Sequence, residues 1–274
     1  MKTTVILIRH GHSGANLPEH SELIRGRTFL PDADLTDMGR QQIDYLIGYL
    51  RSKQYDWSSA AIYSSPIKRA ALTSRRLCTN LDILPQNLVE IPELTEIGQG
   101  IWNEKPRTEV YSPKNMQVIR RFAPLFRPPG NYPSNLDSIY ADDSVINQEF
   151  YSNGGESIAD VSVRSNSYLR SVLDRQSHNI VLLVTHLWPL KTLLSYGGRF
   201  GSVDETSIAI KELQDGKPVG DIKRRYLLGL ELAMSARRFK IPHAGCYMLE
   251  WDHKRKDLEL DLTPAYIPTT HYTY

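Results

Sequence analysis

Short apolar runs recur along the chain, and each is followed by a polar loop and a segment with helical spacing. The runs at residues 3–8, 59–64, 88–91 and 179–185 predict strands. The helices between them are predicted to begin at Thr36, which serves as an N-cap, and at Pro66, Ser157 and Pro189. This alternation favours an α/β fold, a three-layer α/β/α sandwich with a mostly parallel central sheet.

Two segments interrupt the alternation. Residues 103–153 are rich in proline and tyrosine and show no sustained period, which predicts a lid-like insertion. Residues 197–240 form a second expected insertion with a basic helical portion. Residues 245–252 and 258–262 alternate around a polar turn, which predicts a hairpin at a sheet edge. We expect one domain over residues 1–274 that carries both insertions.

Composition excludes several classes of partner. The chain has 33 Lys and Arg against 31 Asp and Glu, a net charge of +2, and shows no basic excess typical of a nucleic-acid binder. The longest apolar stretches have about five residues, whereas a membrane-spanning helix needs about 20. Only two cysteines occur, and the N-terminal apolar run is too short for a secretory signal. We therefore expect a cytoplasmic protein, and a homodimer through a sheet edge is compatible with the sequence.

Polar residues follow three of the predicted strands. Arg9 and His10 follow the first, Arg69 lies shortly after the second, and His186 follows the strand at 179–185. The carboxyl ends of parallel strands meet at one edge of a sheet, so these side chains should share a pocket. Such a pocket suits a phosphate monoester dianion. Because a neutral imidazole is a good nucleophile, phosphoryl transfer to histidine becomes possible.

Six blocks of the sequence carry a family resemblance. They are Arg9-His10-Gly11-His12-Ser13 with Asn16, Asp34-Leu35-Thr36 with Gly39, Ser65-Pro66 with Arg69 and Thr73, Leu94-Thr95-Glu96-Ile97, Gly154-Gly155-Glu156-Ser157, and Val184-Thr185-His186. In residue type and order these blocks resemble the histidine phosphatase superfamily, which includes cofactor-dependent phosphoglycerate mutases. With the closing hairpin, the resemblance covers most of the chain.

The resemblance implies a metal-independent phosphatase of small phosphorylated metabolites that uses no cofactor. His10 would attack phosphorus and form a phosphohistidine, while Arg9, Arg69 and His186 hold the phosphate oxygens. Glu96 would protonate the leaving group and then activate water. Glu93 competes for that role, and the alternative function of Glu96 is to cap a helix or to pair with an arginine.

Several of the other candidate residues have more than one interpretation. His12 lines the phosphate pocket or faces solvent, and a metal-binding role is disfavoured because zinc needs three or four ligands. Ser13 and Asn16 are expected to donate hydrogen bonds to phosphate or substrate. Glu156 orients a pocket arginine or stands in the first turn of its helix. Trp188, where the family usually has a small residue, narrows the site, stacks on substrate or packs in the core.

Three further residues bear on specificity. Arg25 and Arg27 lie in a loop that is longer than the family's and could reach a second anionic group on the substrate. His243 lies in the closing loop, where it approaches the pocket or stays at the surface. Two alternative functions stay open, a phosphoglycerate-mutase-type phosphotransferase and a non-catalytic module that binds a phospho-ligand or a protein.

Overall fold

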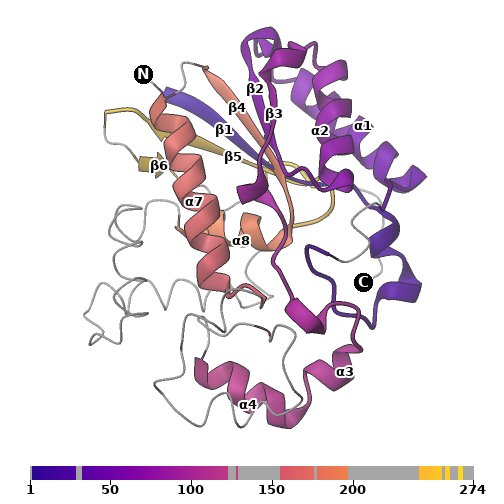
Figure 1. Cartoon of the computed structure of the whole chain (residues 1–274). Coiled ribbons are helices and arrows are strands. Elements are labelled where there is room, and N and C mark those ends of the chain that lie inside the picture. Colours follow the sequence, from indigo (N-terminus) through magenta and orange to yellow (C-terminus); the bar gives the residue numbers. More distant parts are fainter. Residues whose placement is uncertain are drawn as a thin grey trace.

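A six-stranded sheet lies at the centre of the protein (Figure 1). The computed structural model describes residues 2–28, 33–122, 128, 155–175, 178–196, 241–254, 257–259 and 265–267. The strands are β1 (Lys2–Arg9), β2 (Ala61–Ser64), β3 (Leu88–Glu90), β4 (Ile180–Thr185), β5 (Cys246–Asp252) and β6 (Asp257–Glu259), in the order β3-β2-β4-β1-β5-β6. The first four strands are parallel, and the hairpin of β5 and β6 adds the antiparallel edge that the sequence predicts.

Helices cover both faces of the sheet, which confirms the predicted sandwich (Figure 1). The helices are α1 (Asp37–Arg51), α2 (Lys68–Asn80), α3 (Arg107–Val110), α4 (Pro113–Phe122), α7 (Ile158–Arg175) and α8 (Leu187–Tyr196). On one face α1 and α2 pack against the sheet, and on the other α7 and α8 do so.

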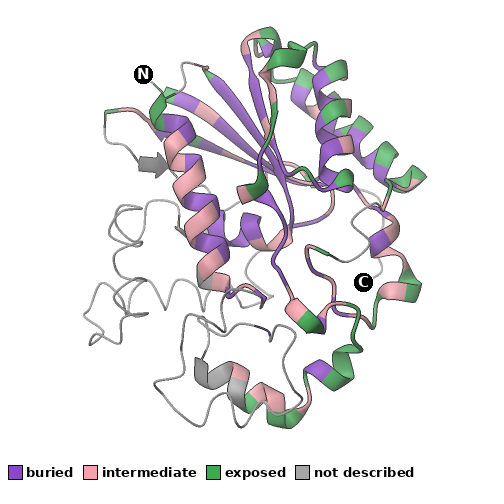
Figure 2. Ribbon diagram, in the orientation of Figure 1, coloured by how far each residue is buried: buried purple, intermediate pink, exposed green. Residues whose placement is uncertain are grey.

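The alternation of side chains along β1 builds both halves of the core. Ile6 and Ile8 belong to the cluster that contains Leu46 of α1, whereas Val5 and Leu7 belong to the cluster that contains the apolar residues of α7 and α8. Successive side chains of a strand point to opposite faces, so one apolar run serves two layers. Figure 2 shows the result, with mostly buried strands between two helical layers; α1 and α2 carry many exposed residues, whereas α7 is buried or intermediate along most of its length.

Several element boundaries differ from prediction. The second strand begins at Ala61 because residues 57–59 form a 3-10 turn, and the helix predicted from Pro66 begins at Lys68. The helix predicted from Pro189 begins two residues earlier, at Leu187. Proline is tolerated in the first turn of a helix because its missing N–H would have no intrahelical partner there.

The lid-like insertion is partly regular. Its first part contains α3 and α4, although the sequence shows no sustained period there. The remainder of 103–153, apart from residue 128, and all of 197–240 lie outside the described residues. Within the part of the chain that can be described, no helix combines the length and apolarity of a membrane span. The homodimer with which the sequence is compatible is not tested by these observations.

Two glycines allow the loop after β1 to pack against the start of α1. A Cβ added to Gly39 would lie 1.9 Å from the carbonyl oxygen of His12, and one added to Gly11 would lie 2.9 Å from the carbonyl oxygen of Gly39. The hydroxyl of Thr36 caps α1 by accepting from the N–H of Gly39 at 3.1 Å, as predicted. This close approach fixes the loop that begins with His10.

We therefore expect Gly39→Ala to lower the free energy of unfolding by about 1–3 kcal/mol, the usual cost of overpacking. The matched control is Gly48→Ala in the same helix, because a Cβ there would meet nothing within 4 Å. Replacing an exposed helical glycine by alanine should stabilise the protein by about 0.5–1 kcal/mol. Urea denaturation measures the free energy of unfolding of both variants. Equal changes in the two would contradict the close packing of Gly39 against the loop after β1.

Candidate active site

A cavity of about 310 Å³ lies where β1 and β4 end, next to the first turn of α8. The residues that line it are Arg9, His10, Ala15, Asn16, Ile24, Arg25, Gly26, Arg69, Glu96, Gln99, Arg107, Tyr111, Leu187, Trp188 and Lys191. The structure thus brings four of the five predicted catalytic side chains to the wall of one cavity. The fifth, His186, lies directly behind it.

The ring of His10 is held in one tautomer. Its Nδ1 lies 2.8 Å from the carbonyl oxygen of Gly11, which can only accept, so Nδ1 carries the proton and Nε2 keeps its lone pair. Burial lowers the pKa of His10 well below its ordinary value, and the positive charges of Arg69 and Arg9 lower it further. The ring is therefore neutral near pH 7 and presents a nucleophilic nitrogen.

His186 stands beside His10, with their ring centroids 5.0 Å apart. It follows β4, while the backbone N–H of His10 donates to the carbonyl of Thr185 at 3.0 Å, so strand pairing sets this distance. The Nε2 of His186 contacts the hydroxyl of Ser65 at 2.8 Å. Its buried Nδ1 has no hydrogen-bond partner within the described part of the chain. Burial and the nearby Arg69 lower the pKa of His186 well below its ordinary value.

Two arginines flank the histidine pair. Arg9 donates from Nη1 to the carbonyl of Ile241 at 2.7 Å, which fixes its side chain. Arg69 lies in the first turn of α2 and is only 5% exposed. Its buried Nη1 lacks a hydrogen-bond partner among the residues described. A buried unpaired donor costs about 1–3 kcal/mol, and an oxyanion in the cavity would remove that cost.

Glu96 is the acidic residue of the cavity wall, and Glu93 does not line it. The Glu96 carboxylate also caps α8, since Oε1 accepts from the N–H of Trp188 and Oε2 from that of Leu187, both at 3.2 Å. Oε1 accepts a further bond from Ile97 at 2.9 Å. Glu96 therefore caps a helix, as one interpretation expected, and it also lines the cavity, where its role as proton donor stays a prediction.

His12, Ser13 and Asn16 differ in their position relative to the cavity. Asn16 lines the cavity, but His12 and Ser13 do not. The hydroxyl of Ser13 donates to Oδ1 of Asn16 at 3.0 Å, which leaves the Nδ2 amide of Asn16 to serve the cavity. His12 contacts the hydroxyl of Thr36 at 2.9 Å and lies edge-on to His243, which in turn lies 5.5 Å from His10.

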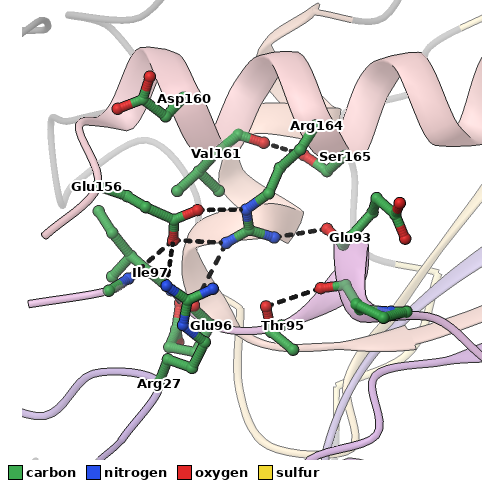
Figure 3. Close-up of polar contacts among 12 residues, drawn as sticks. Arg27, Glu93, Thr95, Glu96, Ile97, Glu156, Asp160, Val161, Arg164 and Ser165 are labelled. Atoms are coloured by element: carbon green, nitrogen blue, oxygen red, sulfur yellow. Dashed lines mark hydrogen bonds and ion pairs between the residues drawn. The ribbon is translucent and has the colours of Figure 1, made fainter. Parts of the chain in front are cut away.

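Glu156 also lies away from the cavity wall and forms an ion pair with Arg164 of α7 at 2.8 Å (Figure 3). It accepts a bond from the N–H of Gly98, while Arg164 donates to the carbonyls of Glu93 and Glu96. Burial alone would raise the pKa of Glu156, but the hydrogen bonds and charge of Arg164 outweigh it and lower the pKa. The pair holds the backbone segment that carries Glu96.

The two loop arginines have different surroundings. Arg25 lines the cavity and donates to the carbonyl of Ala15 at 3.2 Å. Arg27 lies 4.0 Å from the carboxylate of Glu156 and does not reach the cavity wall. Of the two, only Arg25 is placed to meet a second anionic group.

Sequence reasoning missed two cations of the cavity, Arg107 and Lys191. Lys191 is a lysine in an otherwise largely apolar helix and is 6% exposed, which is the signal that could have revealed it. Its ammonium lies 4.7 Å from the ring centroid of Trp188. Trp188 therefore forms part of the cavity wall and supports a cation there. Arg107 lies in the predicted insertion, where the sequence analysis found no sustained hydrophobic period and no motif that would mark it as a cavity residue.

The described residues contain no group of three or more His, Cys, Asp and Glu side chains arranged to hold a metal ion. The charged groups that the cavity does present are mostly cationic, and these suit an anion.

Comparisons with known proteins bear on the family and the fold. The chain is 27% identical over 191 residues to phosphoserine phosphatase 1 of Hydrogenobacter thermophilus, covering 69% of this chain and 73% of that protein. Its fold is similar to that of a mycobacterial glucosyl-3-phosphoglycerate phosphatase, with a TM-score of 0.58 at 16% identity and coverage of 95% and 98% of the two chains. It is also similar to YhfR of Bacillus stearothermophilus, with a TM-score of 0.56 at 20% identity and coverage of 94% and 95%.

These two structural likenesses show the fold alone, because their sequence identities are low. The family assignment rests on a sequence model, that of the histidine phosphatase superfamily (branch 1), which matches residues 5–218. This match includes all six blocks that carry the resemblance, and it confirms the prediction of a phosphatase of this type. The chain belongs to the histidine phosphatase superfamily.

Proposed function

We propose that this protein hydrolyses a small phosphorylated metabolite through a phosphohistidine formed at His10, without a metal ion. The observation that carries the proposal is the fixed tautomer of His10, whose unprotonated Nε2 belongs to a cavity that also contains Arg9 and Arg69. A neutral nucleophile among cations is arranged to attack the phosphorus of an anionic ester.

In the first step the Nε2 lone pair of His10 attacks phosphorus and the ester P–O bond breaks. Arg9, Arg69 and His186 stabilise the equatorial oxygens. Arg69 has an unpaired Nη1 for them, and Nδ1 of His186 is a donor in the tautomer whose Nε2 accepts from the Ser65 hydroxyl. Asn16 contributes its amide Nδ2. Arg9 and Arg69 supply the positive charge that a metal ion supplies in other phosphatases, while His186 and Asn16 add neutral hydrogen-bond donors.

Glu96 moves the proton in both steps. In its protonated form it donates to the leaving alkoxide, and the resulting carboxylate then takes a proton from the water that attacks the phosphohistidine. Its Oε2 accepts one backbone N–H while Oε1 accepts two, so Oε2 is the oxygen with room for that proton. The cycle returns phosphate, the alcohol and protonated Glu96.

Two further observations support the proposal. A cavity of about 310 Å³ is of the size that small ligands occupy, and two similar proteins are named phosphatases of phosphoserine and of glucosyl-3-phosphoglycerate. Cys78 and Cys246 are both free and buried, which supports the expected cytoplasmic location because such compartments keep thiols reduced.

The decisive measurement is hydrolysis of p-nitrophenyl phosphate in excess chelator. Wild-type activity should survive the chelator, and His10→Ala should reduce kcat by about a thousandfold or more, as loss of a nucleophile does. His20→Ala, outside the cavity, is the matched control and should change little. Activity retained by His10→Ala, or lost on chelation, would overturn the proposed mechanism. A phosphoenzyme that persists and interconverts phosphoglycerates would favour the mutase alternative.

NMR of histidine-labelled protein tests the protonation state of His10. An ordinary imidazole is half protonated at about pH 6.5, whereas burial and two arginines lower the pKa of His10, so it should stay neutral there and charge only at lower pH. Its Nδ1 should carry the proton. Spectra of His10→Ala and His186→Ala assign the signals, and half protonation of His10 at or above about pH 6.5 would refute this geometry.

Comparison of two leaving groups tests Glu96. Glu96→Gln removes the proton donor, so hydrolysis of an alkyl phosphate should fall by about a hundredfold or more. The kcat/KM for p-nitrophenyl phosphate should fall much less, because this constant reports only the steps up to release of the alcohol and that leaving group needs little protonation. Glu93→Gln is the control for the neighbouring carboxylate that does not line the cavity. Equal losses of kcat/KM on both substrates in folded Glu96→Gln would contradict the role of Glu96 as proton donor.

A further inference from the structure

A largely buried ion pair lies behind the cavity and takes no part in the proposed chemistry. The Glu156 carboxylate binds the Arg164 guanidinium through two hydrogen bonds, from Nε to Oε1 at 2.8 Å and from Nη2 to Oε2 at 3.0 Å, and each side chain is 17% exposed. Neither residue lines the cavity. A buried ion pair is often no more stabilising than apolar side chains of similar size, because its desolvation offsets much of the attraction. Stability alone is therefore a weak explanation for this pair.

The Arg164 guanidinium holds the backbone at Glu96 and on its N-terminal side (Figure 3). Its Nη1 donates to the carbonyl of Glu93, and its Nη2 donates to the carbonyl of Glu96 at 3.3 Å. The end of the 3-10 turn Pro92–Leu94 lies between these two carbonyls. Because the guanidinium is planar and carries its N–H groups in a fixed fork, one side chain sets the separation and the orientation of both carbonyls.

Glu156 holds the same segment on the C-terminal side of Glu96. Its Oε2 accepts from the N–H of Gly98 at 2.8 Å, and its own N–H donates to the carbonyl of Gly98 at 2.7 Å. A Cβ added to Gly98 would lie 3.0 Å from Nη2 of Arg27 and 3.6 Å from Cγ of Glu156, so the segment is closely packed at this point. The ion pair thus holds the backbone at residues 93, 96 and 98, on both sides of the Glu96 side chain.

The position of this backbone decides where the Glu96 carboxylate lies. The two carboxylate oxygens accept from the N–H groups of Ile97, Leu187 and Trp188, of which the last two begin α8. The side chain is therefore held at its far end by α8 and at its backbone by Arg164, and the two attachments together place the carboxylate on the cavity wall. Proton transfer needs the donor and the acceptor within hydrogen-bond reach, and a misplacement of about 1 Å can lower a rate about a hundredfold.

We propose that Glu156 and Arg164 are positioning residues for the proton donor: Glu156 orients Arg164, and Arg164 fixes the backbone of Glu96 so that its carboxyl group reaches the leaving oxygen. This inference rests on the proposed function, in which Glu96 protonates the alcohol. It predicts that disruption of the pair slows the hydrolysis of esters that need this proton. Binding of phosphate itself should not change, because neither residue lines the cavity.

Hydrolysis of two esters by Arg164→Met and Glu156→Gln tests the inference. In Arg164→Met, kcat/KM for propyl phosphate should fall by at least about tenfold more than kcat/KM for p-nitrophenyl phosphate, whose leaving group needs little protonation. Glu156→Gln keeps the size of the side chain and removes its charge, so it should cause a smaller loss with the same selectivity. Asp174→Asn is the matched control and should leave the ratio unchanged, because it breaks an ion pair of the same helix, Arg170 with Asp174 at 3.1 Å, outside the cavity.

Two further measurements separate positioning from general damage to the fold. By titration calorimetry, inorganic phosphate should bind Arg164→Met with a dissociation constant within about twofold of that of wild type. When Arg164→Met is added to Glu96→Gln, the ratio of kcat/KM for the two esters should stay as it is in Glu96→Gln alone, because no proton donor is left to position. Arg164→Met leaves Glu156 without its ionic partner, so the double variant Glu156→Gln/Arg164→Met, which removes both charges, provides the test if the single variant fails to fold.

The outcomes separate this inference from the proposed function. Equal losses on both esters in Arg164→Met, weakened phosphate binding, or a selective loss that persists in the Glu96→Gln background overturns the positioning role. If Glu96→Gln nevertheless loses activity selectively toward propyl phosphate, Glu96 stands as the proton donor. Conversely, equal losses in Glu96→Gln together with a selective loss in Arg164→Met would show that the pair acts on another donor, which overturns both the role of Glu96 and this inference.

Discussion

The parallel pairing of β1 with β4 is the interaction on which the rest of this structure depends. It joins Ile8 to Val184 and Arg9 to Thr185, and one residue further it leaves His10 beside His186, where both strands end. The same pairing buries one apolar strand between the two helical layers, so the core that stabilises the fold also sets the separation of the two imidazoles. Any displacement of β4 along β1 would cost core packing before it altered the site, which makes the histidine pair a rigid element.

Burial and charge work together in the cavity. Two buried histidines with lowered pKa values stay neutral among arginines that keep their charge, since a guanidinium does not release its proton near neutral pH. The empty site is therefore electrostatically strained and contains unsatisfied donors. A bound phosphate lowers the repulsion among the cations and accepts hydrogen bonds from the unsatisfied donors. The reaction is accelerated to the extent that these interactions are stronger in the transition state than in the ground state.

Much of this arrangement could be predicted from the sequence, because it depends on local patterns. The apolar run of β1 predicts that the strand contributes to the core on both faces of the sheet. The residues directly after β1 and β4 must share the carboxyl edge of the sheet, because both strands are parallel, and this does not depend on where the helices pack. Arg107 could not be found in this way. It reaches the cavity because the backbone of 103–107 pairs with the loop that carries Arg25, through bonds such as Arg107 N–H to Glu22 and Ile24 N–H to Lys105. Such pairing between distant segments leaves no hydrophobic period in either sequence.

The position of Glu96 links the proposed proton transfer to the architecture of the cavity wall. Its carboxylate caps α8 through the N–H groups of Leu187 and Trp188, and α8 also presents the side chains of Trp188 and Lys191 to the cavity. Behind it, the ion pair of Glu156 with Arg164 fixes the segment that carries Glu96 (Figure 3). The group proposed to move the proton therefore also caps the start of the helix that carries Trp188 and Lys191 to the cavity wall. A substitution of Glu96 that keeps its size but removes its charge would still weaken this cap, because the carboxylate favours the positive end of the helix dipole.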